Sequence, residues 1–273
     1  MNWLQALVLG VVQGLTEFLP ISSTAHLRIV PHYLGWGDPG IAFSAVIQLG
    51  TLFAVFIYFA GDVKMLVVAA FDGLRHRDFK RSPETLLAFS IAVGTLPIAV
   101  IGLSFKDFIE TEARGLNIIG SALIALAVVL MAAERLGKRQ LDMQQLSFWQ
   151  IQCIGLCQAL ALIPGCSRSG STIMGGLFVG LKRAESARFS FLLGLPAIGA
   201  SGLLEFLDLL EGGLGEEGLI NIGVGILAAA VSGYASIGFL LRFLERYGTD
   251  VFSLYRIGLG GLILYGFSTG STP

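Results

Sequence analysis

Six long apolar stretches constrain the fold of this chain more than any other feature of its sequence. A helix needs about 20 mostly apolar residues to cross the hydrocarbon core of a bilayer. The stretches of about this length lie near residues 40–60, 86–103, 116–135, 186–207, 218–241 and 251–268. Only 14% of the 273 residues are charged, against about 25% in an average soluble domain. The sequence therefore predicts an all-α polytopic membrane protein, with six transmembrane helices in one integral membrane domain over residues 1–273.

Two further apolar regions, residues 3–34 and 148–181, are each interrupted by a polar segment that contains proline. We name these interruptions the first break, residues 19–24 (LPISST), and the second break, residues 163–169 (IPGCSRS). Neither half of either region is long enough to span a bilayer comfortably. Broken helices at membrane depth are tolerated only where they face protein or a water-filled cavity. The pattern therefore predicts two re-entrant helical hairpins.

The charges of the connecting segments predict which side of the membrane each one faces. Residues 61–85 and 135–147 are rich in Lys and Arg, which favours the cytoplasmic side; the amphipathic stretch 62–83 is expected to lie on that surface. Residues 205–217 hold five acidic residues and no Lys or Arg, and residues 104–115 are mixed. By alternation these two segments and both termini are predicted outside. The first hairpin then enters from outside and the second from the cytoplasm.

A short internal repeat links the two broken regions. The matched positions are residues 10–15 with 155–160 at an offset of 145, and then Pro20 and Ser23 with Pro164 and Ser167 at an offset of 144. This alignment implies that one residue has been lost between the two matches. Three spans separate the copies, so halves of about 1–135 and 148–268 are predicted as inverted-topology repeats. Such repeats place a site near the midplane where the breaks meet. Chance similarity is the alternative.

The first broken region contains side chains suited to catalysis. They are Gln13, Glu17, Ser22, Ser23 and His26. Gln13 and Glu17 share one helix face, and ionisable groups inside membrane segments are costly and usually functional. Ser23 and His26 are close enough to meet on a helix, and either His26 or Glu17 could take the proton of an attacking serine. Ser22 is the weaker nucleophile candidate. The alternative is a hairpin tip at the aqueous interface, where Glu17 and His26 are only solvated.

The second break has the composition of an anion-binding segment. Its candidate phosphate ligands are Gly165, Ser167, Arg168, Ser169 and Thr172. Backbone N–H groups at a helix N-terminus attract anions, and arginine offers planar, bidentate donors to phosphate. The alternative is a capping loop whose Arg168 reaches the cytoplasmic interface. Because phosphoryl transfer depends mostly on positioning and charge neutralisation, the two breaks together indicate a phosphatase.

Two segments resemble the signature motifs of the undecaprenyl-diphosphate phosphatase family, also called the bacitracin-resistance family. Residues 13–26 (QGLTEFLPISSTAH) resemble the motif (E/Q)xxxE and its extension, and residues 164–172 (PGCSRSGST) resemble PGxSRSxxT. Residues 47–50 and 189–193 also look like family segments. The resemblance covers nearly the whole chain, and both motifs occur in the family's order.

The resemblance implies an enzyme of the bacterial inner membrane that hydrolyses undecaprenyl diphosphate to undecaprenyl phosphate and inorganic phosphate. Such an enzyme recycles the lipid carrier for cell-wall synthesis and confers bacitracin resistance, with its main active site open to the periplasm. By motif match, Ser23 would be the nucleophile and Arg168 the phosphate ligand. Glu17 and His26 would be the acid–base or orienting groups, with the choice of base left open. Gln13 and Ser22 would support them.

The resemblance also bears on cofactors and partners. Gln13 stands where many relatives carry Glu, which weakens a metal role for two carboxylates and leaves Glu17 as the one candidate metal ligand. No cofactor is required, although Mg²⁺ or Ca²⁺ is left open as a neutraliser of the diphosphate. The expected partners are a polyprenyl diphosphate lipid and the bilayer, with a homodimer left open. A net charge of −1 provides no basic field for nucleic acid.

A transporter is the main rival interpretation. A transporter or flippase of a phosphorylated polyprenyl lipid would share the inverted repeats and broken helices. Transport needs no nucleophile beside an anion site, which favours the enzyme. A receptor or scaffold forms a third class, for which substitutions of Ser23 or Arg168 would not matter.

Overall fold

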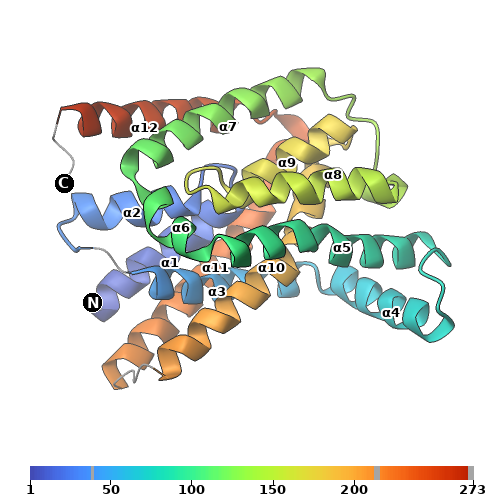
Figure 1. Cartoon of the computed structure of the whole chain (residues 1–273), viewed down its shortest axis with the longest axis horizontal. Helices are drawn as coiled ribbons and strands as arrows, with labels where there is room; N and C mark the ends of the chain where they lie inside the picture. Colours follow the sequence, from blue (N-terminus) through green and yellow to red (C-terminus); the bar gives the residue numbers. More distant parts are fainter. Residues whose placement is uncertain (38–39, 212–215, 270–273) are drawn as a thin grey trace.

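The computed structural model describes residues 1–37, 40–211 and 216–269 as a bundle of helices (Figure 1). The elements are α1 (Trp3–Phe18), α2 (Ser23–Tyr33), α3 (Ile41–Tyr58), α4 (Ala60–His76), α5 (Pro83–Ser104), α6 (Lys106–Glu110), η1 (Glu112–Arg114), α7 (Leu116–Leu136), η2 (Met143–Gln145), α8 (Phe148–Ala159), η3 (Leu160–Leu162), α9 (Arg168–Val179), α10 (Arg183–Glu211), α11 (Glu216–Arg246) and α12 (Asp250–Ser268). Within the described ranges, β pairing is limited to an isolated bridge between Leu141 and Leu181. The all-α prediction is confirmed.

Five helices are long and apolar enough to cross a membrane, namely α5, α7, α10, α11 and α12. They coincide with five of the six predicted spans, as expected of a multi-pass membrane protein. A sixth span is reached only when α3 and α4 are counted together, and these two helices are bent by 85° at Phe59. Within residues 1–37, 40–211 and 216–269, length and composition therefore give five candidate spans, or six if the bent pair is one span.

Helix α4 occupies most of residues 61–85, which the sequence analysis assigned to a connection and a surface segment. Asp62 lies in its first turn, Arg75 and His76 lie in its last, and Arg77 ends it in the left-handed conformation. Acidic residues at the start and basic residues at the end of a helix complement its dipole. These signals explain why the charged segment is helical.

The segment predicted as an acidic outer loop, residues 205–217, is helical at both ends. Helix α10 continues to Glu211, and α11 begins at Glu216; residues 212–215 lie outside the described residues. At its other end α11 runs to Arg246, beyond the predicted boundary at 241. Leu, Glu and Arg dominate these extensions and are good helix formers.

Each broken region consists of two short helices on either side of its break. Helices α1 and α2 flank the first break and pack against each other, as do α8 and α9 around the second. These four helices have 16, 11, 12 and 12 residues, fewer than the roughly 20 that a span needs. Both breaks therefore lie where the sequence analysis predicted them.

Each break contains a serine in the same unusual backbone conformation, directly before the helix that follows. Ser22 caps α2 with φ 75°, and Ser167 caps α9 with φ 66°, a region that residues other than glycine rarely occupy. Each hydroxyl accepts a hydrogen bond from a backbone N–H in the first turn of its helix. The two serines are 145 residues apart, the offset of the match between residues 10–15 and 155–160. The predicted repeat instead pairs Ser167 with Ser23, the residue after the α2 cap.

Glycines at matched positions bring the short helices close to longer ones. A Cβ atom added at Gly10 of α1 would lie 2.4 Å from the carbonyl oxygen of Gly225 in α11. One added at Gly155 of α8 would lie 2.3 Å from the carbonyl oxygen of Gly94 in α5. Small residues permit such close backbone approach in membrane proteins. These contacts hold each broken region against the bundle.

Replacing Gly155 with valine is expected to lower thermal stability, because the new side chain would displace α8 from α5. Overpacking of this kind costs about 1–3 kcal/mol. Thermal unfolding of the purified protein in detergent measures the effect. Gly258→Val is the matched control, since a Cβ atom at this helical glycine meets nothing within 4 Å. An equal loss of stability in the two variants would contradict the packing argument.

Candidate active site

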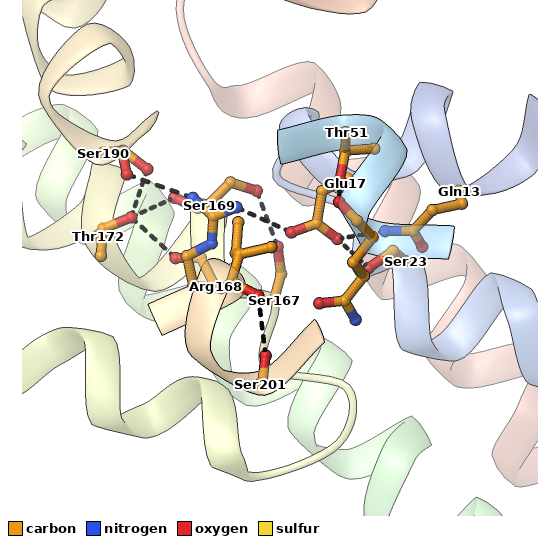
Figure 2. Close-up of polar contacts among 12 residues, drawn as sticks. Gln13, Glu17, Ser23, Thr51, Ser167, Arg168, Ser169, Thr172, Ser190 and Ser201 are labelled. Atoms are coloured by element: carbon orange, nitrogen blue, oxygen red, sulfur yellow. Dashed lines mark hydrogen bonds and ion pairs between the residues drawn. The ribbon is translucent and has the colours of Figure 1, made fainter. Parts of the chain in front are cut away.

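Glu17 connects the two breaks through hydrogen bonds to both of its carboxylate oxygens (Figure 2). Its Oε1 accepts from Nη2 of Arg168 at 2.8 Å. Its Oε2 accepts from Oγ of Ser23 at 2.7 Å and from Nε2 of Gln13 at 3.0 Å. Figure 2 shows Glu17 between Arg168 on one side and Gln13 and Ser23 on the other. One carboxylate therefore joins side chains from α1, α2 and α9.

Arg168 is buried against α10, with only 9% of its side chain exposed. Its Nη1 donates to the carbonyl oxygen of Ser190 at 3.2 Å. Its Nε is buried and has no hydrogen-bond partner among the described residues. A Cβ atom added at Gly194 would lie 2.1 Å from Nη1, so this glycine makes room for the guanidinium. The alternative in which Arg168 reaches the membrane interface is wrong, because its charge is paired with Glu17.

The Ser23 hydroxyl contacts Glu17, and no hydrogen bond joins it to His26 within the described chain. His26 instead uses both ring nitrogens elsewhere. Its Nδ1 is 2.7 Å from the carbonyl oxygen of Ser22, which can only accept, so Nδ1 carries a proton. Its Nε2 is 2.7 Å from the Tyr255 hydroxyl of α12, and the two rings are stacked. The geometry favours Glu17 over His26 as the base next to Ser23.

Among the hydroxyl groups in and just after the second break, Ser169 contacts the first break and the others bond within their own region or to α10. Ser169 is buried and donates to the carbonyl oxygen of Leu19 at 3.2 Å, and its oxygen is 3.1 Å from Oγ of Ser167. Thr172 is also buried, and its hydroxyl donates to the carbonyl oxygen of Arg168 at 2.8 Å. Ser167 and Arg168 are the partly accessible members of this group. They are the side chains best placed for a ligand.

Gly165 and Ser22 serve the backbone of the breaks. Gly165 has φ 102°, and a Cβ atom there would lie 2.5 Å from the carbonyl oxygen of Ile119 in α7. Its own carbonyl accepts a hydrogen bond from Arg256. Gly165 therefore packs closely against α7, and its role as a phosphate ligand stays a prediction. Ser22 is buried as the cap of α2.

The donor set around Glu17 does not fit a metal ion held by the protein. Both carboxylate oxygens accept hydrogen bonds from N–H or O–H groups, and Gln13 directs its amide nitrogen toward the same carboxylate. Within residues 1–37, 40–211 and 216–269, no three His, Cys, Asp or Glu side chains form a group that could hold a metal ion. The metal role left open for Glu17 gains no support from its contacts.

Four residues around the site were not assigned by the sequence analysis. They are Ser190 and Gly194 of α10, and Tyr255 and Arg256 of α12. Two of them carried a readable signal: Arg256 is a charged residue inside the predicted span 251–268, and Ser190 lies in residues 189–193, which look like a family segment. The contacts of Gly194 and Tyr255 depend on how distant helices pack.

Comparison with known proteins identifies the same family as the two sequence motifs that contain the site residues. Residues 6–262 match the family described as bacitracin resistance protein BacA. The chain belongs to the BacA family. The predicted resemblance is therefore confirmed, and the family match includes both breaks.

Several relatives of this BacA-family chain carry the name undecaprenyl-diphosphatase. A protein of Synechococcus sp. (strain JA-2-3B'a(2-13)) is 50% identical over 269 residues, covering 98% of this chain and 95% of its own. One from Myxococcus xanthus (strain DK1622) is 50% identical over 270 residues, covering 99% of this chain and 91% of its own. One from Chlorobaculum tepidum is 50% identical over 273 residues, covering 97% of both chains.

Proposed function

We propose that this chain hydrolyses undecaprenyl diphosphate to undecaprenyl phosphate and inorganic phosphate. This activity would recycle the lipid carrier for cell-wall synthesis and confer bacitracin resistance. Membership of the BacA family and the name of the relatives support the substrate. The observation that carries the chemistry is the chain of hydrogen bonds from Ser23 to Glu17 and from Glu17 to Arg168. It puts a hydroxyl, a proton acceptor and a phosphate ligand side by side.

Ser23 is the nucleophile in this proposal. Its Oγ forms a bond to the terminal phosphorus while the anhydride P–O bond breaks, and its proton passes to Glu17. Undecaprenyl phosphate leaves, and a phosphoserine remains. Water then forms a bond to the phosphorus as the Oγ–P bond breaks, Ser23 regains a proton through Glu17, and inorganic phosphate leaves. The 2.7 Å contact between Ser23 and Glu17 supports this proton transfer.

Arg168 binds the terminal phosphate in this proposal and neutralises the charge that develops during transfer. Its Nε lacks a protein acceptor among the described residues, and a phosphate oxygen would supply one. Charge stabilisation by preorganised donors is strong in a site with little water, and the Arg168 side chain is mostly buried. Ser167, next to it at the start of α9, is the hydroxyl best placed to assist.

Glu17→Gln is expected to lower kcat by about 10³-fold, whereas His26→Gln should lower it by about tenfold or less, because general base catalysis typically contributes 10²–10⁴-fold. The amide that replaces the carboxylate cannot accept the proton of Ser23. His26 would act by orienting the start of α2 through Ser22 and Tyr255. Steady-state kinetics of the two variants separate these roles. A larger loss in His26→Gln than in Glu17→Gln would move the base to His26.

Gly194→Ala is expected to lower kcat/KM by about 100-fold, since small misplacements of a catalytic group cost rates of this order. The new methyl group would occupy the position of Arg168 Nη1. Gly199→Ala on the same helix is the control, because a Cβ atom there meets only Leu52 at an ordinary 3.7 Å. Equal activity of the two variants would show that Arg168 does not need its position beside Gly194.

The proposal includes a topology in which both broken regions are re-entrant hairpins of inverted repeats. In the bacterial inner membrane, both termini would lie outside and the site would open to the periplasm. The start of α1 and the end of α12 lie at one end of the bundle, and the basic α4–α5 and α7–η2 connections lie at the other (Figure 1), which supports this orientation. In a Cys153→Ser background, an impermeant thiol reagent should label Tyr33→Cys in intact spheroplasts and Lys138→Cys only after lysis. The reverse pattern would invert the topology.

The function is tested by phosphate release from undecaprenyl diphosphate with the purified protein in detergent. Turnover that depends on Ser23 supports the phosphatase. If the protein binds the lipid but releases no phosphate, with or without divalent ions, a transporter or flippase explains the site better. The Ser23–Glu17 hydrogen bond favours the enzyme, because lipid transport has no use for an activated hydroxyl.

A further inference from the structure

Arg256 of α12 has a fully buried guanidinium whose hydrogen-bond acceptors are all backbone carbonyls. None of its surface is exposed. Its donors reach the carbonyl oxygens of Leu123, Pro20, Ala122, Gly165 and Cys166, at distances between 2.9 and 3.4 Å. No salt bridge pairs it with a carboxylate in the described part of the chain. A buried charge held in this way needs an explanation, because removing it from water is costly.

The five acceptors belong to three separate parts of the chain. Pro20 lies in the first break, Gly165 and Cys166 lie in the second, and Ala122 and Leu123 belong to α7. Arginine is suited to such a position because its planar group presents five donors in fixed directions. A single side chain thus fastens both breaks to each other and to a long helix.

The carbonyls that Arg256 holds are close in sequence to the reacting groups. Pro20 precedes Ser23 by three residues, and Cys166 precedes Arg168 by two. The guanidinium also lies at the first turn of α9, since a Cβ atom added at Gly170 would be 3.3 Å from its Nη1. The position of the Arg256 guanidinium therefore affects the backbone next to Ser23 and the backbone next to Arg168.

The geometry points to Arg256 as a positioning residue for the phosphatase reaction, an inference that rests on the function proposed above. It holds the two breaks at the spacing at which Ser23 and Glu17 meet Arg168. It also adds a positive charge that no carboxylate neutralises among the described residues, behind the start of the helix where the phosphate would bind. Arg256 itself does not touch the substrate.

Glu134 provides a comparison that separates a positioning role of Arg256 from a purely structural one. Like Arg256, it joins α7 to α12, but it does so at the end of α7 and the start of α12. Glu134 of α7 accepts hydrogen bonds from the backbone N–H and the hydroxyl of Thr249, at the start of α12, and pairs with Arg183. Its hydrogen bonds and ion pairs involve neither break. Glu134→Gln is therefore a matched control that weakens the α7–α12 connection and leaves the site intact.

The first measurement is the kinetics and thermal stability of Arg256→Met, Arg256→Lys and Glu134→Gln. Both Arg256 variants should lose about 100-fold in kcat, with KM changed by less than about threefold. Lysine should not rescue activity, because one ammonium cannot reach both breaks. Glu134→Gln should lower the melting temperature and keep kcat within about threefold of wild type. If kcat falls in proportion to the melting temperature in all three variants, including Glu134→Gln, the inference is overturned.

The second measurement does not depend on activity. In a Cys153→Ser, Cys157→Ser background, the remaining Cys166 lies buried in the second break. Arg256→Met should increase its rate of maleimide labelling by about tenfold or more, because local opening exposes it, whereas Glu134→Gln should not. Unchanged labelling would overturn the inference that Arg256 holds the breaks. If the wild type releases no phosphate, the proposed function fails, and faster labelling would still support Arg256 as the residue that holds the breaks.

Discussion

Replacing Ser23 with alanine should abolish phosphate release from undecaprenyl diphosphate while the protein still binds the lipid. Ser23 is partly accessible, and its hydroxyl donates a hydrogen bond to the Glu17 carboxylate. Removing a catalytic nucleophile from a triad-type site lowers kcat by up to about 10⁶-fold, and we expect a loss of at least about 10³-fold here. Binding is maintained because Arg168 and the start of α9 are unchanged.

The measurement is phosphate release and lipid binding by the same purified sample, compared with wild type and with Ser44→Ala. Ser44 lies in α3, where its hydroxyl donates to the carbonyl oxygen of Gly40 at the start of the same helix, so its loss should leave kcat within about threefold. Retained turnover in Ser23→Ala would remove Ser23 from the role of nucleophile. If Ser23→Ala loses both lipid binding and turnover, the hydroxyl instead holds the substrate.

Arg168→Lys should lower kcat/KM by about 10³-fold, although the positive charge is kept. Arginines that stabilise phosphoryl transfer contribute 10³–10⁵-fold. One ammonium group cannot contact Glu17 and the Ser190 carbonyl as the two Nη atoms of Arg168 do, and it offers phosphate no planar pair of donors.

The control for Arg168→Lys is Arg183→Lys, which also changes an arginine paired with a buried carboxylate. Arg183, at the start of α10, pairs with Glu134 in the last turn of α7. Kinetics of the two variants should differ by about two orders of magnitude or more. If lysine supports near wild-type activity at position 168, charge alone is sufficient and the bidentate role of Arg168 is wrong.

The sequence predicted the parts of this fold that depend on local composition. Apolar length located α5, α7, α10, α11 and α12, and the polar, proline-containing segments located both breaks. The 85° bend at Phe59 lies at the end of the predicted span 40–60, and helix α4 beyond it was missed because Asp62, Lys64 and the basic residues that follow indicated a connection between spans. The predicted repeat pairs Ser23 with Ser167, whereas the serines that cap α2 and α9 are Ser22 and Ser167.

The sequence could suggest candidate site residues, but it could not predict which of them contact one another. The meeting of Glu17 with Arg168 and of Glu17 with Ser23 depends on how α1, α2 and α9 pack, which residue spacing does not determine. Spacing on one helix suggested a Ser23–His26 pair, but tertiary packing directs His26 to Tyr255. Gly165 packs against Ile119, and the Thr172 hydroxyl donates to the carbonyl oxygen of Arg168; their expected role at the phosphate stays a prediction.

The central claim is that the two breaks form one catalytic unit, and a double-mutant cycle tests it most directly. Glu17→Gln alters the first broken region, and Arg168→Lys alters the second. Residues that act as a unit have strongly non-additive effects on catalysis. The kcat/KM of the double variant should therefore lie within about tenfold of the worse single variant. Losses that multiply would contradict the claim, because they would show that Glu17 and Arg168 act independently.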